Sequence, residues 1–247
     1  MCLVAFAFGV SEDYPLLFAT NRDELHTRPT SKSKWWEDHT HILGGRDLLA
    51  GGTWLAIDQS GRLAAVTNMP SNSGITFKKS RGHLVGDYLI DRFPVDEYLS
   101  TLNNNGIKYA PYNLLTFDGN NMFYSSNKAS EKPFSPGTYA ISNAPIGTRW
   151  PKICFAESMV TSALTSATPV DDLFEMLENQ DLQHSKEDSF NYEDRQSRTF
   201  IKNKLFGTRS STVIAISGKG EVQFIERRYS PEGIRVEENQ YTFTLGS

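Results

Sequence analysis

Four pairs of short apolar runs, each pair joined by a tight polar loop, constrain the fold of this chain more than any other feature. The pairs join 3–8 to 16–20, 53–57 to 63–67, 114–117 to 122–125 and 212–216 to 222–226. Their loops, such as Asp58-Gln59-Ser60-Gly61, contain the Asp, Asn, Ser and Gly residues that β-turns favour. Two runs connected in this way form an antiparallel hairpin. The chain is therefore predicted to contain extensive antiparallel sheet.

Amphipathic helices are predicted between these hairpins. Apolar residues at 84–89 fall on one helical face after a possible cap at Ser80, and Pro151 is suited to the first position of a helix that continues through 156–164. Thr168 and Pro169 open a further short helix. Hairpins interleaved with such helices are typical of an α+β fold in which helices cover layered antiparallel sheets.

The length and composition limit the class of protein. The 247 residues contain no Pro/Gly/Ser linker, which predicts a single domain over 1–247. A net charge of -4 argues against a nucleic-acid partner, and no apolar run approaches the roughly 20 residues of an integral membrane segment. Two cysteines, Cys2 and Cys154, suit a reducing compartment, so a cytoplasmic location is predicted, with a disulfide between them left open. The polar stretch 185–198 is a solvated helix, a loop or a lid.

Three apolar runs end on Thr or Ser followed by Asn, which places Asn21, Asn68 and Asn143 in similar positions. An amide is both donor and acceptor, so repeated Asn residues at strand ends suit a site that holds a carbonyl, a carboxylate or an oxyanion. The alternative is that Asn only terminates strands, as it often does. Together with Cys2, the repetition predicts that these amides line one pocket.

Cys2 is the candidate nucleophile. If an aminopeptidase removes Met1, the α-amino group of Cys2 has a reference pKa of about 7.7–8.0 and can act as a base for its own thiol. The alternative is a small buried hydrophobic residue at the start of an inner strand. Acyl transfer from an amide also needs a cation, a carboxylate and oxyanion donors. The candidates for these roles are Arg22, Asp23, Asn68, Asn143 and Arg209.

An ordered set of motifs resembles one known family. The motifs are Thr20-Asn21-Arg22-Asp23-Glu24, Arg28-Pro29, Ala50-Gly51-Gly52-Thr53-Trp54-Leu55, Val66-Thr67-Asn68, Ser80-Arg81-Gly82, Ser142-Asn143-Ala144-Pro145, Trp150-Pro151-Lys152 and Gly207-Thr208-Arg209-Ser210-Ser211-Thr212. This set resembles the NRDE family, also called the transport and Golgi organisation family, over nearly the whole chain. The resemblance implies the N-terminal-nucleophile hydrolase superfamily, and with it a four-layer αββα sandwich of two antiparallel sheets between helix layers.

The same resemblance implies roles for individual residues. The superfamily includes bile-salt hydrolases and penicillin V acylases, and by local context Cys2, Asn68, Asn143 and Arg209 match their nucleophile, oxyanion-side and late arginine positions. Arg22 and Asp23 are adjacent, whereas those enzymes separate the two residues. Because consecutive side chains of a strand point to opposite faces, both can face the thiol only if the backbone turns. Asp23 can instead pair with Arg28 or Arg46.

Two functions from different classes follow. Family members are implicated in intracellular haem trafficking, which implies a carrier of haem or a similar amphiphilic carboxylate, with haem donor and acceptor proteins as partners. Asn21, Arg22, Asn68, Asn143 and Arg209 are the predicted ligand-binding residues. The alternative is a Cys2-dependent amidohydrolase acting on a linear or acyl amide. Neither function requires a cofactor or a metal, and candidate axial groups for haem are Cys2, His26, His39, His41 and His83.

Overall fold

The computed structural model describes residues 2–71, 77, 79–105, 108–181 and 196–246. Most of the polar stretch 185–198 lies outside these residues, so the choice between helix, loop and lid stays open. The chain forms two compact units, each assembled from separate segments. The first unit comprises Met1–Thr27, Pro136–Ser142 and Gly147–Phe243, and the second comprises Arg28–Ser135, Asn143–Ile146 and Thr244–Ser247.

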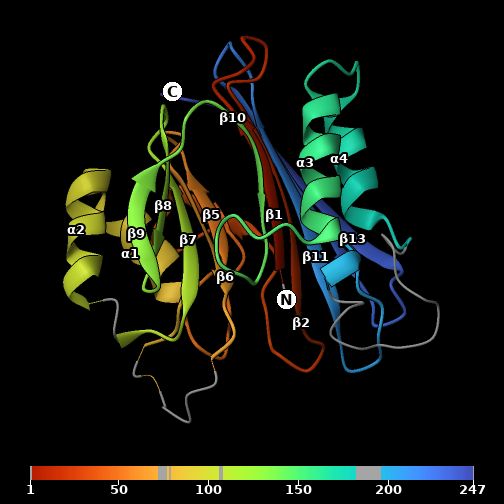
Figure 1. Cartoon of the computed structure of the whole chain (residues 1–247), viewed down its shortest axis with the longest axis horizontal. Helices are drawn as coiled ribbons and strands as arrows, with labels where there is room; N and C mark the ends of the chain where they lie inside the picture. Colours follow the sequence, from red (N-terminus) through yellow and green to blue (C-terminus); the bar gives the residue numbers. More distant parts are fainter. Residues whose placement is uncertain (1, 72–76, 78, 106–107, 182–195, 247) are drawn as a thin grey trace. The chain divides into compact units, whose positions relative to one another are not determined.

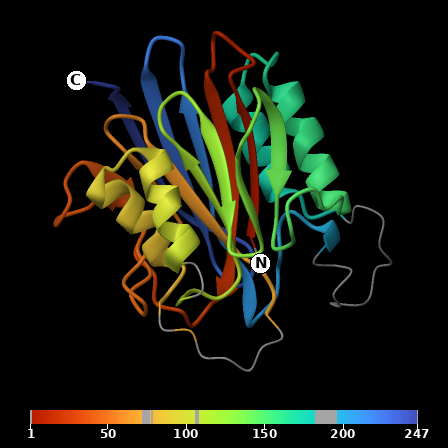
Figure 2. The same cartoon turned by 60° about the vertical axis from the view of Figure 1, so that its left-hand side comes forward.

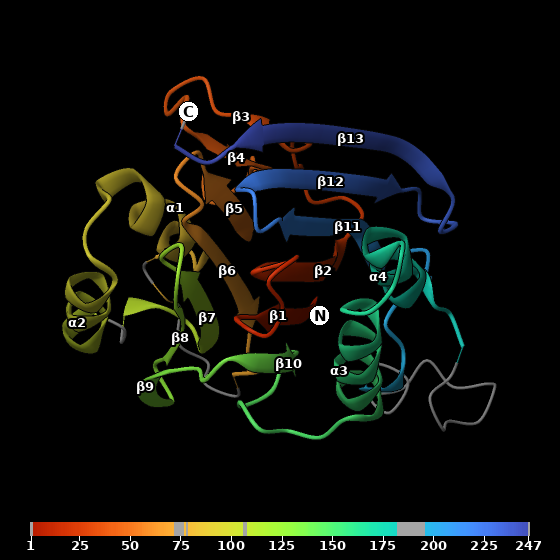
Figure 3. The same ribbon diagram turned by 90° about the horizontal axis from the view of Figure 1, so that it is seen from above.

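The first unit is a sheet of strand order β10-β1-β2-β11-β12-β13 with two helices against one face (Figure 1). Its elements are β1 Cys2–Phe8, β2 Leu16–Leu25, β10 Gly137–Ile141, α3 Pro151–Ala163, α4 Pro169–Glu178, β11 Phe206–Ile216, β12 Glu221–Tyr229 and β13 Arg235–Thr244. Figure 3 shows these strands in succession, with β1 and β2 near the middle. The pairs β10–β1, β1–β2, β2–β11 and β11–β12 are antiparallel.

The core of the first unit fixes which side chains of β1 and β2 face the helices. Leu3, Ala5 and Ala7 of β1 share one buried cluster with Leu17 and Ala19 of β2 and with apolar residues of α3 and α4. Side chains alternate along a strand, so odd-numbered positions of both strands face the helices and even-numbered positions face the other way. This alternation decides the placement of the candidate site residues described below.

The second unit is a sheet of strand order β3-β4-β5-β6-β7-β8-β9, in which neighbouring strands are all antiparallel (Figure 3). Figure 2 shows the two helices of this unit, coloured yellow, in the foreground. Its elements are β3 Lys34–Trp35, β4 Ile42–Gly44, β5 Leu55–Asp58, β6 Leu63–Asn68, α1 Gly82–Asp91, α2 Val95–Asn105, β7 Tyr112–Phe117, β8 Met122–Ser126 and β9 Ala129–Pro133. Helix α1 packs on β5 and β6, and its buried face shares a core with Trp36, Ile42 and residues of α2.

The four predicted hairpins are all confirmed, as β1–β2, β5–β6, β7–β8 and β11–β12. The helix beginning at Pro151 is confirmed, as is the one after Thr168. The N-cap residue of α1 is Arg81 and not the predicted Ser80, although the Ser80 hydroxyl accepts a hydrogen bond of 3.3 Å from the backbone N–H of Gly82. The predicted strand end at Asn21 is also wrong, because β2 continues to Leu25. The sequence analysis missed α2 and the strands β3, β4, β9 and β13.

Candidate functional site

Strands β1 and β2 bring Cys2 and Arg22 together in the first unit. Cys2 is the first residue of β1 and lies directly opposite Arg22 in the antiparallel register, so both side chains belong to the face turned away from α3 and α4. Arg22 is only 5% exposed. Ser142 donates a hydrogen bond of 2.7 Å to the Cys2 carbonyl oxygen and holds the start of the strand. The predicted pairing of a cysteine with a cation is therefore present.

Asp23 acts on the thiol through its backbone. Its side chain belongs to the helix-facing side of β2, where Oδ1 accepts a hydrogen bond of 2.7 Å from Thr208. The backbone N–H of Asp23 hydrogen-bonds the Cys2 thiol, which lowers the thiol pKa, as does Arg22. Burial is the larger effect, and together with the Asp23 carboxylate it raises the pKa of Cys2 above its ordinary value. The thiol is therefore mainly protonated at neutral pH.

The backbone of β2 does not turn at Arg22 and Asp23. The two side chains occupy opposite faces of the strand, as strand geometry requires, and both are buried. Of the cations considered as partners for Asp23, Arg28 forms an ion pair of 2.7 Å with Asp47, and Arg46 forms one with Asp38. Burial raises the pKa of Asp23, while Lys152, the Thr208 hydroxyl and Arg22 lower it.

Asn21 is fully buried on the helix-facing side of β2. Its amide nitrogen donates to the carbonyl oxygens of Leu177 at 2.7 Å and Thr199 at 2.8 Å. Its amide oxygen accepts a hydrogen bond from the Ser211 hydroxyl. These contacts tie β2 to the end of α4, to the segment around Thr199 and to β11. The role of Asn21 in ligand binding stays a prediction.

A β-bulge in β11 sets the position of Arg209. Thr208 lies opposite Asp23 and Ser210 lies opposite Arg22, so Arg209 is the extra residue of the bulge. Its guanidinium donates a hydrogen bond of 3.0 Å to the carbonyl oxygen of Leu25. Burial lowers the pKa of Arg209, and repulsion from Arg22 and Arg228 lowers it further. The bulge thus places a second guanidinium close to Arg22.

Asn68 and Asn143 come together in the second unit. Asn68 ends β6, and its carbonyl oxygen accepts a hydrogen bond of 2.5 Å from the Asn143 amide. Asn113 of β7 holds the same segment, because its amide nitrogen donates to the Ala144 carbonyl oxygen at 3.0 Å. The same amide also contacts Thr67, and its oxygen accepts from the Tyr124 hydroxyl. That these amides share a pocket with Cys2 stays a prediction.

Lys152 and Asn113 are the positions of interest that the sequence analysis missed. Lys152 is the second residue of α3 and is completely buried, with electrostatic contact to Asp23 and Cys2. The sequence places it in a motif, but a single lysine in a helix does not reveal its burial. Asn113 precedes the apolar run of its strand and has no distinguishing sequence context. Only the pairing of β6, β7 and β8 shows that its side chain lies among residues of neighbouring strands.

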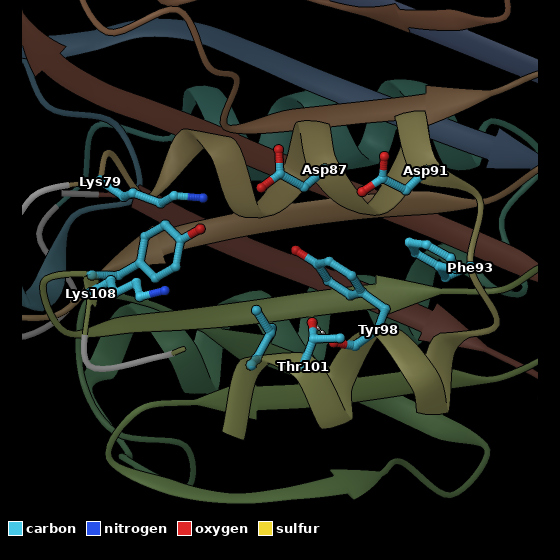
Figure 4. Close-up of a pocket in the computed structure, with 9 residues that line it drawn as sticks. Lys79, Asp87, Asp91, Phe93, Tyr98, Thr101 and Lys108 are labelled. Atoms are coloured by element: carbon cyan, nitrogen blue, oxygen red, sulfur yellow. Dashed lines mark hydrogen bonds between the residues drawn. The ribbon is translucent and has the colours of Figure 1, made fainter. Parts of the chain in front are cut away.

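A cavity of about 200 Å³ lies between α1 and α2, within the second unit (Figure 4). It is lined by Lys79, Asp87, Asp91, Phe93, Tyr98, Thr101, Leu102, Lys108 and Tyr109. Asp87 and Asp91 lie on α1 and Tyr98 on α2, and the Tyr98 hydroxyl donates to the Leu84 carbonyl oxygen at 2.6 Å. The cavity is lined by none of the predicted site residues.

Comparison with solved structures identifies the class of fold. The C2A mutant of the conjugated bile acid hydrolase from Clostridium perfringens matches with a TM-score of 0.58 and 10% sequence identity, covering 99% of this chain and 98% of that chain. At this identity the likeness shows the fold alone. The chain has the α+β fold of the N-terminal-nucleophile hydrolase class, with antiparallel sheets and their helix layers, as predicted.

The family follows from sequence comparison. The family model described as Transport and Golgi organisation 2 matches residues 1–231. The chain is 31% identical over 276 residues to the Transport and Golgi organization 2 homolog of Mus musculus, with 100% of both chains covered, and equally to the Homo sapiens homolog. The chain belongs to the Transport and Golgi organisation 2 family, which confirms the predicted resemblance. Within the described residues, none of the helices has the length and apolar character to cross a bilayer.

Proposed function

We propose that this protein binds and hands on haem or a similar amphiphilic carboxylate, using the Cys2 face of the first unit. The observation that carries the proposal is the concentration of guanidinium groups there. Arg22 is buried, and Arg209 lies close enough to Arg22 and Arg228 for their repulsion to lower its pKa. A carboxylate ligand relieves this repulsion and accepts charge-assisted hydrogen bonds from arginine.

A carrier does not need a thiolate at Cys2, whereas a hydrolase does. Burial raises the pKa of the Cys2 thiol in the chain that retains Met1, so a hydrolase would depend on the amino group that removal of Met1 provides as a base. A carrier also releases its ligand readily if the thiol makes at most a weak axial contact. The proposal places this exchange in the cytoplasm, between haem donor and acceptor proteins.

Haem titration followed by the Soret band tests the carrier, with transfer to an apo-haemoprotein as the second step. Arg209→Gln is expected to weaken haem binding by roughly tenfold, the effect of losing one hydrogen bond to a charged group. Arg235→Gln is the matched control, because Arg235 is an exposed arginine on β13 paired with Glu238. Absence of binding at micromolar protein, or equal binding by both variants, would contradict the proposal.

The second candidate is a Cys2-dependent amidohydrolase acting on a linear or acyl amide. One observation favours it: Cys2 begins β1, lies opposite Arg22 and accepts the Asp23 backbone N–H. The structural neighbour with the same fold is described as a conjugated bile acid hydrolase. Release of amine from a panel of acyl amides, lost in Cys2→Ser, would support this function. Intact mass of the native protein tests the required removal of Met1.

A further inference from the structure

The cavity between α1 and α2 has walls that the second unit holds in place (Figure 4). Tyr98 is 4% exposed, its hydroxyl donates to the Leu84 carbonyl oxygen at 2.6 Å, and its ring centroid lies 5.3 Å from that of Tyr88. Tyr109 is 3% exposed and pairs with Lys79 in a parallel β-bridge. Fixed walls of this kind are typical of ligand sites, which are largely formed before the ligand binds.

Two carboxylates of α1 line this cavity and are not neutralised by a directly bound cation of the chain. Asp87 and Asp91 are four residues apart, so they share one face of the helix, where like charges repel each other. In the part of the chain that the structure describes, neither carboxylate accepts a hydrogen bond or forms an ion pair. Lys79 and His83 attract Asp87 electrostatically from beyond ion-pair distance. A cation on a ligand would relieve the repulsion between the carboxylates.

Aromatic rings line the same cavity. Phe93, Tyr98 and Tyr109 contribute to its surface, and the large apolar side chain of Phe93 is 43% exposed. The face of an aromatic ring attracts an organic cation. A metal ion instead needs several ligands, and the described residues contain no group of three or more His, Cys, Asp or Glu side chains that could hold one. Carboxylates combined with aromatic rings therefore indicate an organic ammonium group.

Two lysines give the cavity a second, oppositely charged end. Figure 4 shows Lys79 and Lys108 at one end and Phe93 at the other, with Asp87 and Asp91 between them. The two lysines lie on neighbouring segments, since the backbone N–H of Lys79 donates to the Lys108 carbonyl oxygen at 3.4 Å. Ammonium groups at this end favour an acidic group on the ligand and disfavour a second amine.

We propose that this cavity binds a small zwitterion that carries an ammonium group and a carboxylate. The ammonium group lies at Asp87 and Asp91, and the carboxylate lies at Lys79 and Lys108. A volume of about 200 Å³ holds roughly seven water molecules at about 30 Å³ each, which suits a ligand of amino-acid size. The proposal goes beyond haem binding and does not depend on it, because the Cys2 face contributes no residue to this cavity.

A titration series with ω-amino acids from glycine to 6-aminohexanoate, which differ in the separation of their charges, tests the proposal. Butylamine and butyrate are the singly charged references. Backbone amide shifts in ¹H–¹⁵N NMR spectra measure each affinity and locate each site. The best zwitterion is expected to bind about tenfold more tightly than either reference, with the largest shifts on α1, α2 and the segment at Tyr109. Equal affinities for the zwitterion and butylamine, largest shifts elsewhere, or no binding at about 10 mM would each overturn the proposal.

Two substitutions of exposed residues test the two ends of the site. Asp91→Asn is expected to weaken binding of the best zwitterion by about tenfold, and Lys108→Gln should remove most of its advantage over butylamine. Glu97→Gln is the matched control, because Glu97 is exposed on α2 and does not line the cavity, and it should leave both affinities unchanged. Unchanged binding by folded Asp91→Asn also overturns the proposal. None of these probes is haem, so this result and that of the haem titration are independent.

Discussion

Two buried asparagines, one in each unit, have different structural roles although they occur in similar sequence contexts. Asn21 and Asn143 both follow a Thr or Ser after an apolar run. Asn21 lies within β2 and joins three segments, whereas Asn143 lies beyond β10 and bonds to Asn68. The difference arises because β2 pairs with β11 as far as Leu25, while β10 ends at Ile141.

Asn21→Ala is expected to destabilise the protein by about 3 kcal/mol. The substitution leaves the carbonyl oxygens of Leu177 and Thr199 and the Ser211 hydroxyl without their buried partner. Urea unfolding followed by circular dichroism measures the loss. Asn120→Ala is the control, because Asn120 is exposed in a hairpin loop and its replacement should change stability by less than about 0.5 kcal/mol. Equal effects of the two substitutions would contradict this assignment.

The sequence allows the residue types of the candidate site to be predicted, but it does not show which residues contact one another there. Cys2 and Arg22 are predicted as site residues because a nucleophilic thiol needs a nearby cation. The antiparallel register of β1 and β2 then places them opposite each other. Lys152 is separated from Cys2 by most of the chain, and its burial depends on how α3 packs on β1. Arg209 depends on one extra residue in β11, which has no local sequence signal. Long-range packing and strand register therefore set what the sequence alone leaves open.

At the scale of elements, two glycine motifs meet in the second unit. Gly52 precedes β5 and Gly82 begins α1, and Thr53 donates a backbone hydrogen bond of 3.1 Å to the Gly82 carbonyl oxygen. A Cβ on Gly52 would lie 2.5 Å from the carbonyl carbon of Gly82. The sequence indicates turns at these glycines, and the structure adds that they allow α1 to approach the loop before β5.

Gly52→Ala is expected to cost at least about 2 kcal/mol of unfolding free energy, because the added methyl group meets backbone that cannot move aside. Gly86→Ala is the matched control within α1. Its Cβ would make only ordinary contacts, at 3.9 Å from Ile90 and 4.0 Å from Trp36. Alanine is the better helix former, so Gly86→Ala should be neutral or stabilise by up to about 1 kcal/mol. Thermal unfolding of both variants shows whether the loss of stability is specific to the close backbone contact at Gly52 or occurs with any glycine substitution in this region.

Asp87 of helix α1 makes the stability of the protein depend on pH. Burial raises the pKa of Asp87, and Asp91 raises it further, while Lys79 and His83 lower it. A carboxyl whose pKa is raised in the folded state binds its proton more tightly there than in the unfolded chain. Its ionisation therefore costs stability at pH 7, and this cost disappears as pH falls through the folded pKa to the unfolded value of about 3.9.

Asp87→Asn is accordingly expected to raise Tm at pH 7. The difference from the unsubstituted protein should shrink as the pH falls through the raised folded pKa and should be lost below about 4, where both states of Asp87 are protonated. Tm measured at several pH values in one ionic strength tests this sign. Asp13→Asn, at an exposed position of the β1–β2 loop, is the control and should show a much smaller difference. A lower Tm for Asp87→Asn at pH 7 would refute the direction.

At the scale of the whole molecule, neither unit is a continuous piece of chain. The segment Pro136–Ser142, which contains β10, belongs to the first unit but lies in the sequence between two segments of the second unit. These two segments are Arg28–Ser135 and Asn143–Ile146. Ser142 bonds to Cys2 in the first unit, while the next residue, Asn143, bonds to Asn68 in the second. Local patterns predict the hairpins inside each unit, but this interleaving depends on pairing between distant strands.

The interleaved chain predicts that residues 1–247 unfold as one domain, in a single transition. Asn21→Ala in the first unit and Gly52→Ala in the second should both move that one transition to lower temperature, because unfolding either unit pulls segments out of the other. In calorimetry the measured enthalpy should equal the van't Hoff enthalpy, with coincident curves from near-UV and far-UV circular dichroism. Two transitions, with each variant shifting only its own, would instead show that the units fold independently despite the shared chain crossings.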